Sequence, residues 1–86
     1  MVIIMEILFY RYGSICEPDI IRAFRQMSLT VLEDTTEITQ KSISDADRIL
    51  SVERIINERH PLFVFSINFY PVISDICHIY RTPYLC

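Results

Sequence analysis

The stretch FVFSINFYP, residues 63–71, decides the fold class of this chain. Most of its residues are aromatic or β-branched, which is typical of a strand buried within a sheet. Asn68 interrupts the apolar run, and Pro71 follows at the kind of position where proline begins a helix. The stretch therefore predicts a core strand over residues 62–69 that runs directly into a helix.

Strands and helices alternate along the rest of the chain. We predict strand 2–10 (with 7–10 sufficient by itself), helix 17–27, strand 29–32, helix 44–60, strand 62–69, a helix from Pro71 to about residue 81, and strand 84–86. The order βαβαβαβ is typical of an α/β fold with right-handed crossovers. We therefore expect one domain, residues 1–86, with a three-layer Rossmann-like architecture and a parallel sheet of about four strands. Because the chain stops within an apolar strand, we expect it to be a truncated half-domain.

Each predicted helix has its own start signal and apolar stripe. Acidic residues and a proline open the first helix, a capping box formed by Ser44 and Asp47 opens the second, and Pro71 opens the third. Ser28 stands where a helix often stops on glycine. The residues expected on the buried stripes are Ile20, Ile21, Phe24, Met27, Ala46, Ile49, Leu50, Val52, Ile55, Ile56, Ile73, Ile76, Cys77 and Tyr80.

Composition excludes several classes of protein. The chain is 51% hydrophobic, so it is not disordered, and its net charge of −3 gives no electrostatic footprint for nucleic acid. No apolar run approaches the length of about 20 residues that spans a membrane, and the start lacks the features of a signal peptide. The odd, widely spaced set of three cysteines predicts free thiols and a cytoplasmic protein.

The candidate ligand site lies at the carboxyl ends of the predicted strands, where open parallel sheets bind their ligands. The residues placed there as substrate-binding candidates are Arg11, Tyr12, Gly13, Ser14, Asn68 and Tyr70. In the first loop, free backbone N–H groups with Arg11 and Ser14 suit a phosphate or a sugar hydroxyl. The alternative is an ordinary turn with Gly13 at positive φ.

Asn68 also has two interpretations. At a strand tip its amide is able to donate to and accept from a sugar or nucleotide. Alternatively, the amide satisfies the backbone of the turn that follows. A response-regulator receiver is disfavoured, because that fold has a phosphorylatable aspartate at this position and an acidic pair after the first strand.

Other chemistry finds little support. The chain has no dinucleotide fingerprint, no nucleophile elbow of the G-x-S-x-G type and no metal-ligand spacing of Cys and His, so we expect no metal. Cys16 lies near a helix start, where a thiolate is stabilised, but neighbouring acids oppose its formation. The acids near the expected crevice that could serve as a general base are Glu17, Asp19, Glu33, Asp34 and Asp75, and none is singled out as catalytic.

Two segments, YRYGSICEPDI (residues 10–20) and FSINFYPVIS (residues 65–74), resemble the N-terminal half of a bacterial glycosyltransferase family. It is the group similar to spore-maturation-protein glycosyltransferases, which has a GT-B architecture of two Rossmann-like domains. The similarity spans essentially the whole chain, although residues 33–59 match only in pattern. Ser28 departs from the glycine that the family often has there.

The resemblance implies transfer of a sugar from a nucleotide-sugar donor to an acceptor. It implies that a missing C-terminal domain binds most of the donor, while the loop 11–17 and the tip 68–71 face the acceptor. We then expect no cofactor in this part of the protein and no activity from it alone. The alternatives are a non-catalytic flavodoxin-like regulatory or ligand-binding domain and, less favoured, a phosphocarrier that uses Cys16. We also expect self-association through the exposed edge of the sheet.

Overall fold

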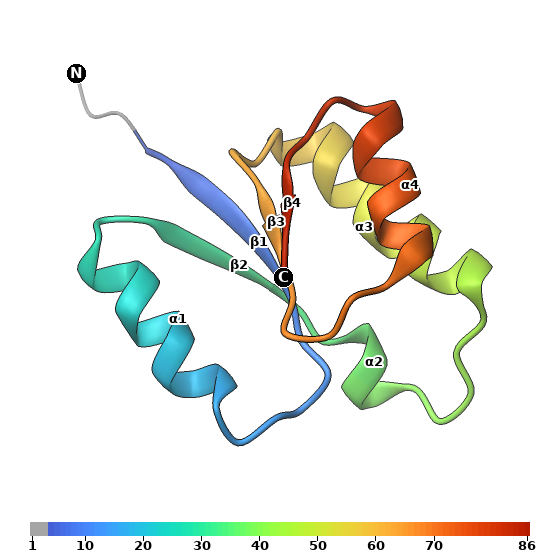
Figure 1. Ribbon diagram of the computed structural model, residues 1–86, viewed down its shortest axis with the longest axis horizontal. Coiled ribbons are helices and arrows are strands. Elements are labelled where there is room, and N and C mark those ends of the chain that lie inside the picture. Colours follow the sequence, from blue (N-terminus) through green and yellow to red (C-terminus); the bar gives the residue numbers. More distant parts are fainter. Residues whose placement is uncertain (1–3) are drawn as a thin grey trace.

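The computed structural model of the chain describes residues 4–86, and residues 2 and 3 of the predicted first strand lie outside this range. In chain order the elements are β1 Glu6–Tyr10, α1 Glu17–Gln26, β2 Thr30–Asp34, α2 Thr36–Thr39, α3 Asp45–Arg59, β3 Val64–Phe65, α4 Pro71–Ile79 and β4 Tyr84–Leu85 (Figure 1). All the predicted elements are therefore present. The short helix α2, which lies between the predicted strand 29–32 and the predicted helix 44–60, was not expected.

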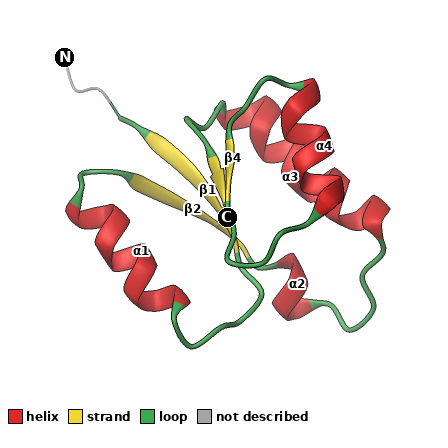
Figure 2. Ribbon diagram, viewed as in Figure 1, coloured by secondary structure: helices red, strands yellow, loops and turns green. Residues whose placement is uncertain are grey.

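The strands form one four-stranded parallel sheet in the order β2-β1-β3-β4. Helix α1 covers one face, and α3 and α4 cover the other, so the molecule has three layers (Figure 2). The predicted α/β class and Rossmann-like layering are confirmed. Within the doubly wound class, this strand order is that of flavodoxin-like domains.

The sheet separates two apolar cores, because successive side chains of a strand point to opposite faces. Ile7 and Phe9 of β1 face α1, while Leu8 and Tyr10 face α3 and α4, and all four are fully buried. The first strand is thus buried on both faces, which is typical of a strand in a parallel sheet and agrees with its apolar run Ile7 to Tyr10. Because β1 lies between β2 and β3, the loop that follows β1 lies between the loops that follow these two strands.

The core under α1 is aromatic. Ile21 is its buried anchor, and Phe24 lies edge-on to Phe9 and Phe65, with ring centroids 6.4 and 5.3 Å away. Such edge-to-face pairs contribute about 0.5–1.5 kcal/mol beyond their burial. Met27, expected on the same stripe, is exposed because the helix ends at Gln26 and the chain has already turned away.

The core under α3 and α4 is aliphatic. Val52 and Ile56 of α3 pack with Ile73, Ile76 and Cys77 of α4 against β1 and β3. The predicted capping box is present, with Ser44 and Asp47 exchanging hydrogen bonds at the start of α3. Three residues expected to be buried are exposed instead: Ala46 and Leu50 of α3, and Tyr80, which follows the end of α4.

The strand predicted over residues 62–69 is shorter than expected. Strand β3 is Val64–Phe65, although backbone hydrogen bonds from Leu62 to Glu6 and from Ser66 to Leu85 extend its pairing by a residue or two at each end. Beyond Ser66 no neighbouring strand is long enough to continue the pairing, since β4 ends at Leu85. Residues 67–70 therefore form a loop at the carboxyl end of the sheet.

The chain has a single glycine, so other residues take the turn positions that glycine usually occupies. Ser28, after α1, has a φ of 67°, so it fills the left-handed position that glycine usually takes after a helix. Gly13 has a φ of 96°, as expected for the turn after β1. Among residues 4–86, no helix has both the length and the apolarity to cross a membrane.

Candidate ligand site at the carboxyl edge of the sheet

The direction in which successive strands are added to the sheet reverses between β1 and β3. From β1 the chain continues through α1 on one face to β2, and it then returns through α3 on the other face to β3. In open α/β sheets, ligands bind at such a reversal, outside the carboxyl ends of the strands. The loop after β1 and the loop after β3 border this position, and these loops contain the six predicted site residues.

The loop after β1 is organised by Glu17, an acid that the sequence placed at the start of the first helix and among the candidate general bases. Glu17, the first residue of α1, is fully buried. Its carboxylate accepts hydrogen bonds from the backbone amides of Tyr12 and Gly13, at 2.8 and 3.0 Å, and from Nε of Arg11 at 3.1 Å. The amides that we expected to be free donors are therefore occupied.

Arg11 and Ser14 are also engaged within the loop. The guanidinium of Arg11 bridges Glu17 to Glu33, 2.7 Å away at the end of β2. Burial opposes the charge of Arg11, but these hydrogen bonds to Glu17 and Glu33 outweigh it and raise its pKa. The hydroxyl of Ser14 accepts a hydrogen bond from the amide of Cys16. The first loop is thus a rigid turn with few polar groups to spare.

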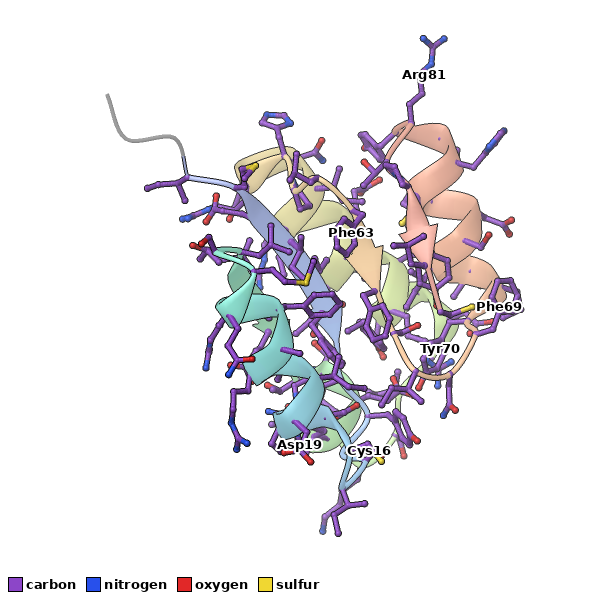
Figure 3. All side chains as sticks on the ribbon, turned by 60° about the vertical axis from the view of Figure 1, so that its left-hand side comes forward. Cys16, Asp19, Phe63, Phe69, Tyr70 and Arg81 are labelled. Atoms are coloured by element: carbon purple, nitrogen blue, oxygen red, sulfur yellow. The ribbon has the colours of Figure 1, made fainter. Side chains whose placement is uncertain are left out.

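The loop after β3 is held by backbone contacts rather than by the Asn68 amide. The carbonyl of Asn68 accepts hydrogen bonds from the hydroxyls of Ser66, at 2.5 Å, and Tyr84, at 3.3 Å. The hydroxyl of Tyr84 also accepts from the backbone amide of Tyr70 at 3.1 Å. The side chain of Asn68 remains exposed and lies near the Tyr70 hydroxyl. Figure 3 shows Phe69 and Tyr70 on this loop, where the chain enters α4.

A cluster of four side chains adjoins the loop after β3, and sequence reasoning identified only one of them, Tyr70. Tyr10 donates a hydrogen bond of 2.7 Å to Glu37 of α2, and Arg48 of α3 holds both carboxylate oxygens of Glu37. The guanidinium of Arg48 also lies 5.5 Å from the ring centroid of Tyr70, and the Tyr70 ring meets that of Tyr10 edge-on at 5.2 Å. We call Tyr10, Glu37, Arg48 and Tyr70 the tyrosine–arginine cluster.

The electrostatics of this cluster follow from its burial and its ion pair. Burial, reinforced by the hydrogen bond to Glu37, raises the pKa of Tyr10, and burial also raises that of Tyr70. The hydrogen bonds from Arg48 hold the pKa of Glu37 below its ordinary value against the opposing effect of burial. One signal pointed to this cluster: a tyrosine at the end of a buried strand needs a partner for its hydroxyl.

An open cavity of about 640 Å³ adjoins the cluster. Glu37 and Arg48 form one wall, and the segment 40–47 forms the rest with polar side chains that include Lys41 and Ser42. Nearby, the carboxyl group of Asp34 is 4% exposed, and one of its oxygens accepts from the amide of Thr36. Its other oxygen, Oδ2, is buried without a hydrogen-bond partner.

The remaining candidates fall outside the crevice. Cys16 is exposed at the end of α1 that faces the carboxyl edge (Figure 3), while Cys77 is buried in the core, where burial raises its pKa to about 11. Cys77 thus packs in the core as predicted. Asp19 pairs with Arg22 on the outer side of α1, and Asp75 is exposed on α4. Within residues 4–86, no group of three His, Cys, Asp or Glu side chains is placed to hold a metal ion.

Comparison with known proteins does not identify a family for this chain. No protein-family model matches the chain, and neither the curated proteins nor the solved structures provide a match.

Proposed function

We propose that the chain is the N-terminal, acceptor-side part of a bacterial, cytoplasmic glycosyltransferase. In this proposal the crevice between β1 and β3 binds the sugar acceptor, and a further domain holds the nucleotide-sugar donor. The chain alone binds acceptor without transferring sugar. The sequence resemblance is the reason for choosing this activity, and the geometry of the carboxyl edge is the reason for choosing this site.

One observation carries the proposal. The second loop at the strand-order reversal offers an exposed amide, Asn68, near the hydroxyl of Tyr70. An amide donates and accepts hydrogen bonds in the way that sugar hydroxyls require, and an aromatic ring suits the apolar face of a sugar. Because the backbone contacts of Ser66 and Tyr84 already hold the loop, the Asn68 side chain is not needed to maintain the turn.

Saturation-transfer NMR on the purified chain tests the proposal with a panel of neutral saccharides and nucleotide sugars. We expect saturation transfer to at least one saccharide, and a weaker signal, by about fivefold, for Asn68→Ala. Losing one or two hydrogen bonds to a ligand typically costs about 1 kcal/mol, which is close to that factor.

The matched control is Asn57→Ala. It removes an exposed amide near the C-terminal end of α3, which donates a hydrogen bond to the hydroxyl of Tyr80. This variant should bind the saccharide as the wild type does. Equal signals from the Asn68→Ala variant and the wild type would contradict the proposed site, and no transfer to any saccharide would contradict the proposed function.

A non-catalytic flavodoxin-like regulatory or ligand-binding domain is the second candidate, and the strand order β2-β1-β3-β4 favours it. The open reading frame downstream of Cys86 separates the two. A second Rossmann-like half supports the transferase, whereas a stop codon shortly after one more strand supports the regulatory domain.

A further inference from the structure

The loop after β1 contains an arrangement that is typical of a bound anion. Two consecutive backbone amides, of Tyr12 and Gly13, and the guanidinium of Arg11 converge on one carboxylate. Backbone N–H groups that converge in this way around a residue of left-handed conformation, here Gly13, form the concave nests that bind phosphates in other proteins. All three donors precede α1, so the arrangement does not depend on the helix N-terminus.

The anion held by these donors is a side chain of the protein, the carboxylate of Glu17. Glu17 has no exposed surface, and a buried carboxylate is stable only where charged and N–H partners compensate for its lost hydration. Its three donors, at 2.8 to 3.1 Å, supply that compensation. Glu17 is also the first residue of α1, so the same contact fixes the start of the helix against the end of β1.

An external anion competes poorly with such an internal one. Displacing Glu17 would leave its carboxylate buried without partners, or would require the start of α1 to move. A tethered group also has an effective concentration in the millimolar range or above, so free phosphate has to exceed that level. The intact loop should therefore exclude phosphate.

We propose that the β1–α1 loop is an anion-binding nest that Glu17 permanently fills, so that the ligand of the adjoining crevice is uncharged where it faces this loop. The inference rests on the proposed function and refines it: the acceptor is a neutral sugar, and a phosphorylated sugar or a nucleotide phosphate does not bind against residues 11–14. Glu17 acts as a positioning residue for Arg11 and the two amides.

Thermal unfolding with inorganic phosphate tests the nest directly. Glu17→Ala empties it and should lower the Tm of the chain. About 100 mM phosphate should then raise the Tm of this variant by about 5 °C relative to chloride at equal ionic strength, because a ligand that binds only the folded state stabilises it. The wild type should show no such difference between phosphate and chloride.

Two variants complete the test. The control is Glu37→Ala, which removes a different partly buried glutamate that forms an ion pair with Arg48. Phosphate should raise the Tm of this variant no more than it raises the Tm of the wild type. If Glu17→Ala does not fold, Glu17→Asp shortens the side chain by one methylene and partly opens the same nest. Phosphate should then shift the amide signals of Tyr12 and Gly13 in the NMR spectrum of Glu17→Asp.

Equal phosphate responses of the Glu17 and Glu37 variants, or phosphate-dependent shifts of Tyr12 and Gly13 in the wild type, would overturn the inference. Either result is independent of whether a saccharide binds. Failure of the nest is therefore distinguishable from failure of the proposed function.

Discussion

Asn68 shows how one residue's role follows from its neighbours. From sequence, its amide had two interpretations, as a ligand contact or as a brace for the next turn. The turn is braced by the carbonyl of Asn68 and the amide of Tyr70, through the hydroxyls of Ser66 and Tyr84. The side chain is left exposed next to Tyr70. The structure thus weakens the interpretation as a brace, and the ligand contact stays a prediction.

Glu37 is the residue whose replacement should change the dependence of stability on pH. Hydrogen bonds from Arg48, and then from Tyr10, lower its pKa in the folded state below the ordinary value of 4.5. Its stabilising contribution is therefore fully present above that value and is lost as the pH falls through the lowered folded-state pKa. Glu37→Gln should cost about 1.5–3 kcal/mol at pH 7 in urea unfolding, the range of a hydrogen bond to a charged group.

The difference between the wild type and the Glu37→Gln variant should shrink as the pH falls from 4.5 toward 2, because the wild-type side chain then also becomes neutral. Glu58→Gln, which changes an exposed glutamate near the end of the same helix that carries Arg48, should follow the wild-type profile. A constant difference across this pH range would show that charge on Glu37 contributes nothing.

At the scale of elements, local signals located every strand and helix except α2. The capping box formed by Ser44 and Asp47 and the proline at position 71 marked helix starts within a residue, because caps act through immediate neighbours. The length of β3 was overestimated, because strand length depends on the partner strands, and β4 ends opposite Phe65. Helix α2 was missed because it has only four residues.

The positions of the candidate site residues in the fold were predictable from the sequence, but their contacts were not. Topology alone placed Arg11 and Asn68 at the same edge of the sheet, because parallel strands end on one side. The pairing of Tyr10 with Glu37 joins residues 27 positions apart, through a helix that was not expected. The burial of Glu17 depends on how the loop folds back, and no pattern in the sequence encodes that path.

Strand β4 supports the loop after β3 through a single hydroxyl. Tyr84 holds the Asn68 carbonyl, the Tyr70 amide and the hydroxyl of Ser66 together. Tyr84→Phe removes these hydrogen bonds and should destabilise the chain by about 1–3 kcal/mol, since it leaves the amide of Tyr70 without a partner. Urea unfolding measures the change.

Tyr80→Phe provides the control, because the hydroxyl of Tyr80 donates to Glu53 at the surface. Its cost should stay below about 0.5 kcal/mol. If the two tyrosine variants lose equal stability, Tyr84 does not have the bracing role assigned to it.

At the scale of the whole molecule, the two faces of the sheet are covered unequally. Helices α3 and α4 lie over one face, but α1 alone lies on the other, toward β2 (Figure 1). Leu85 of β4 faces the α1 side next to Phe65 and is 49% exposed. Within residues 4–86, β4 has no strand on its outer side. An apolar edge of this kind promotes pairing with another chain.

Light scattering should therefore detect self-association of the wild-type chain at high concentration. Leu85→Lys places a charge on the exposed edge and should shift the population to monomer, because edge lysines oppose strand pairing. Thr30→Lys, at the opposite edge strand β2, should leave the association unchanged. A clean wild-type monomer at high concentration would contradict this prediction.

The central claim is that the two loops at the strand-order reversal form one binding site for a neutral sugar. Mapping backbone amide shifts by NMR during titration with a saccharide tests it most directly. The account predicts that the largest shifts fall together on residues 11–14 and on 67–70, with the amides around Asn57 unaffected. Shifts confined to the segment 40–47, or absent from both loops at saturation, would contradict it.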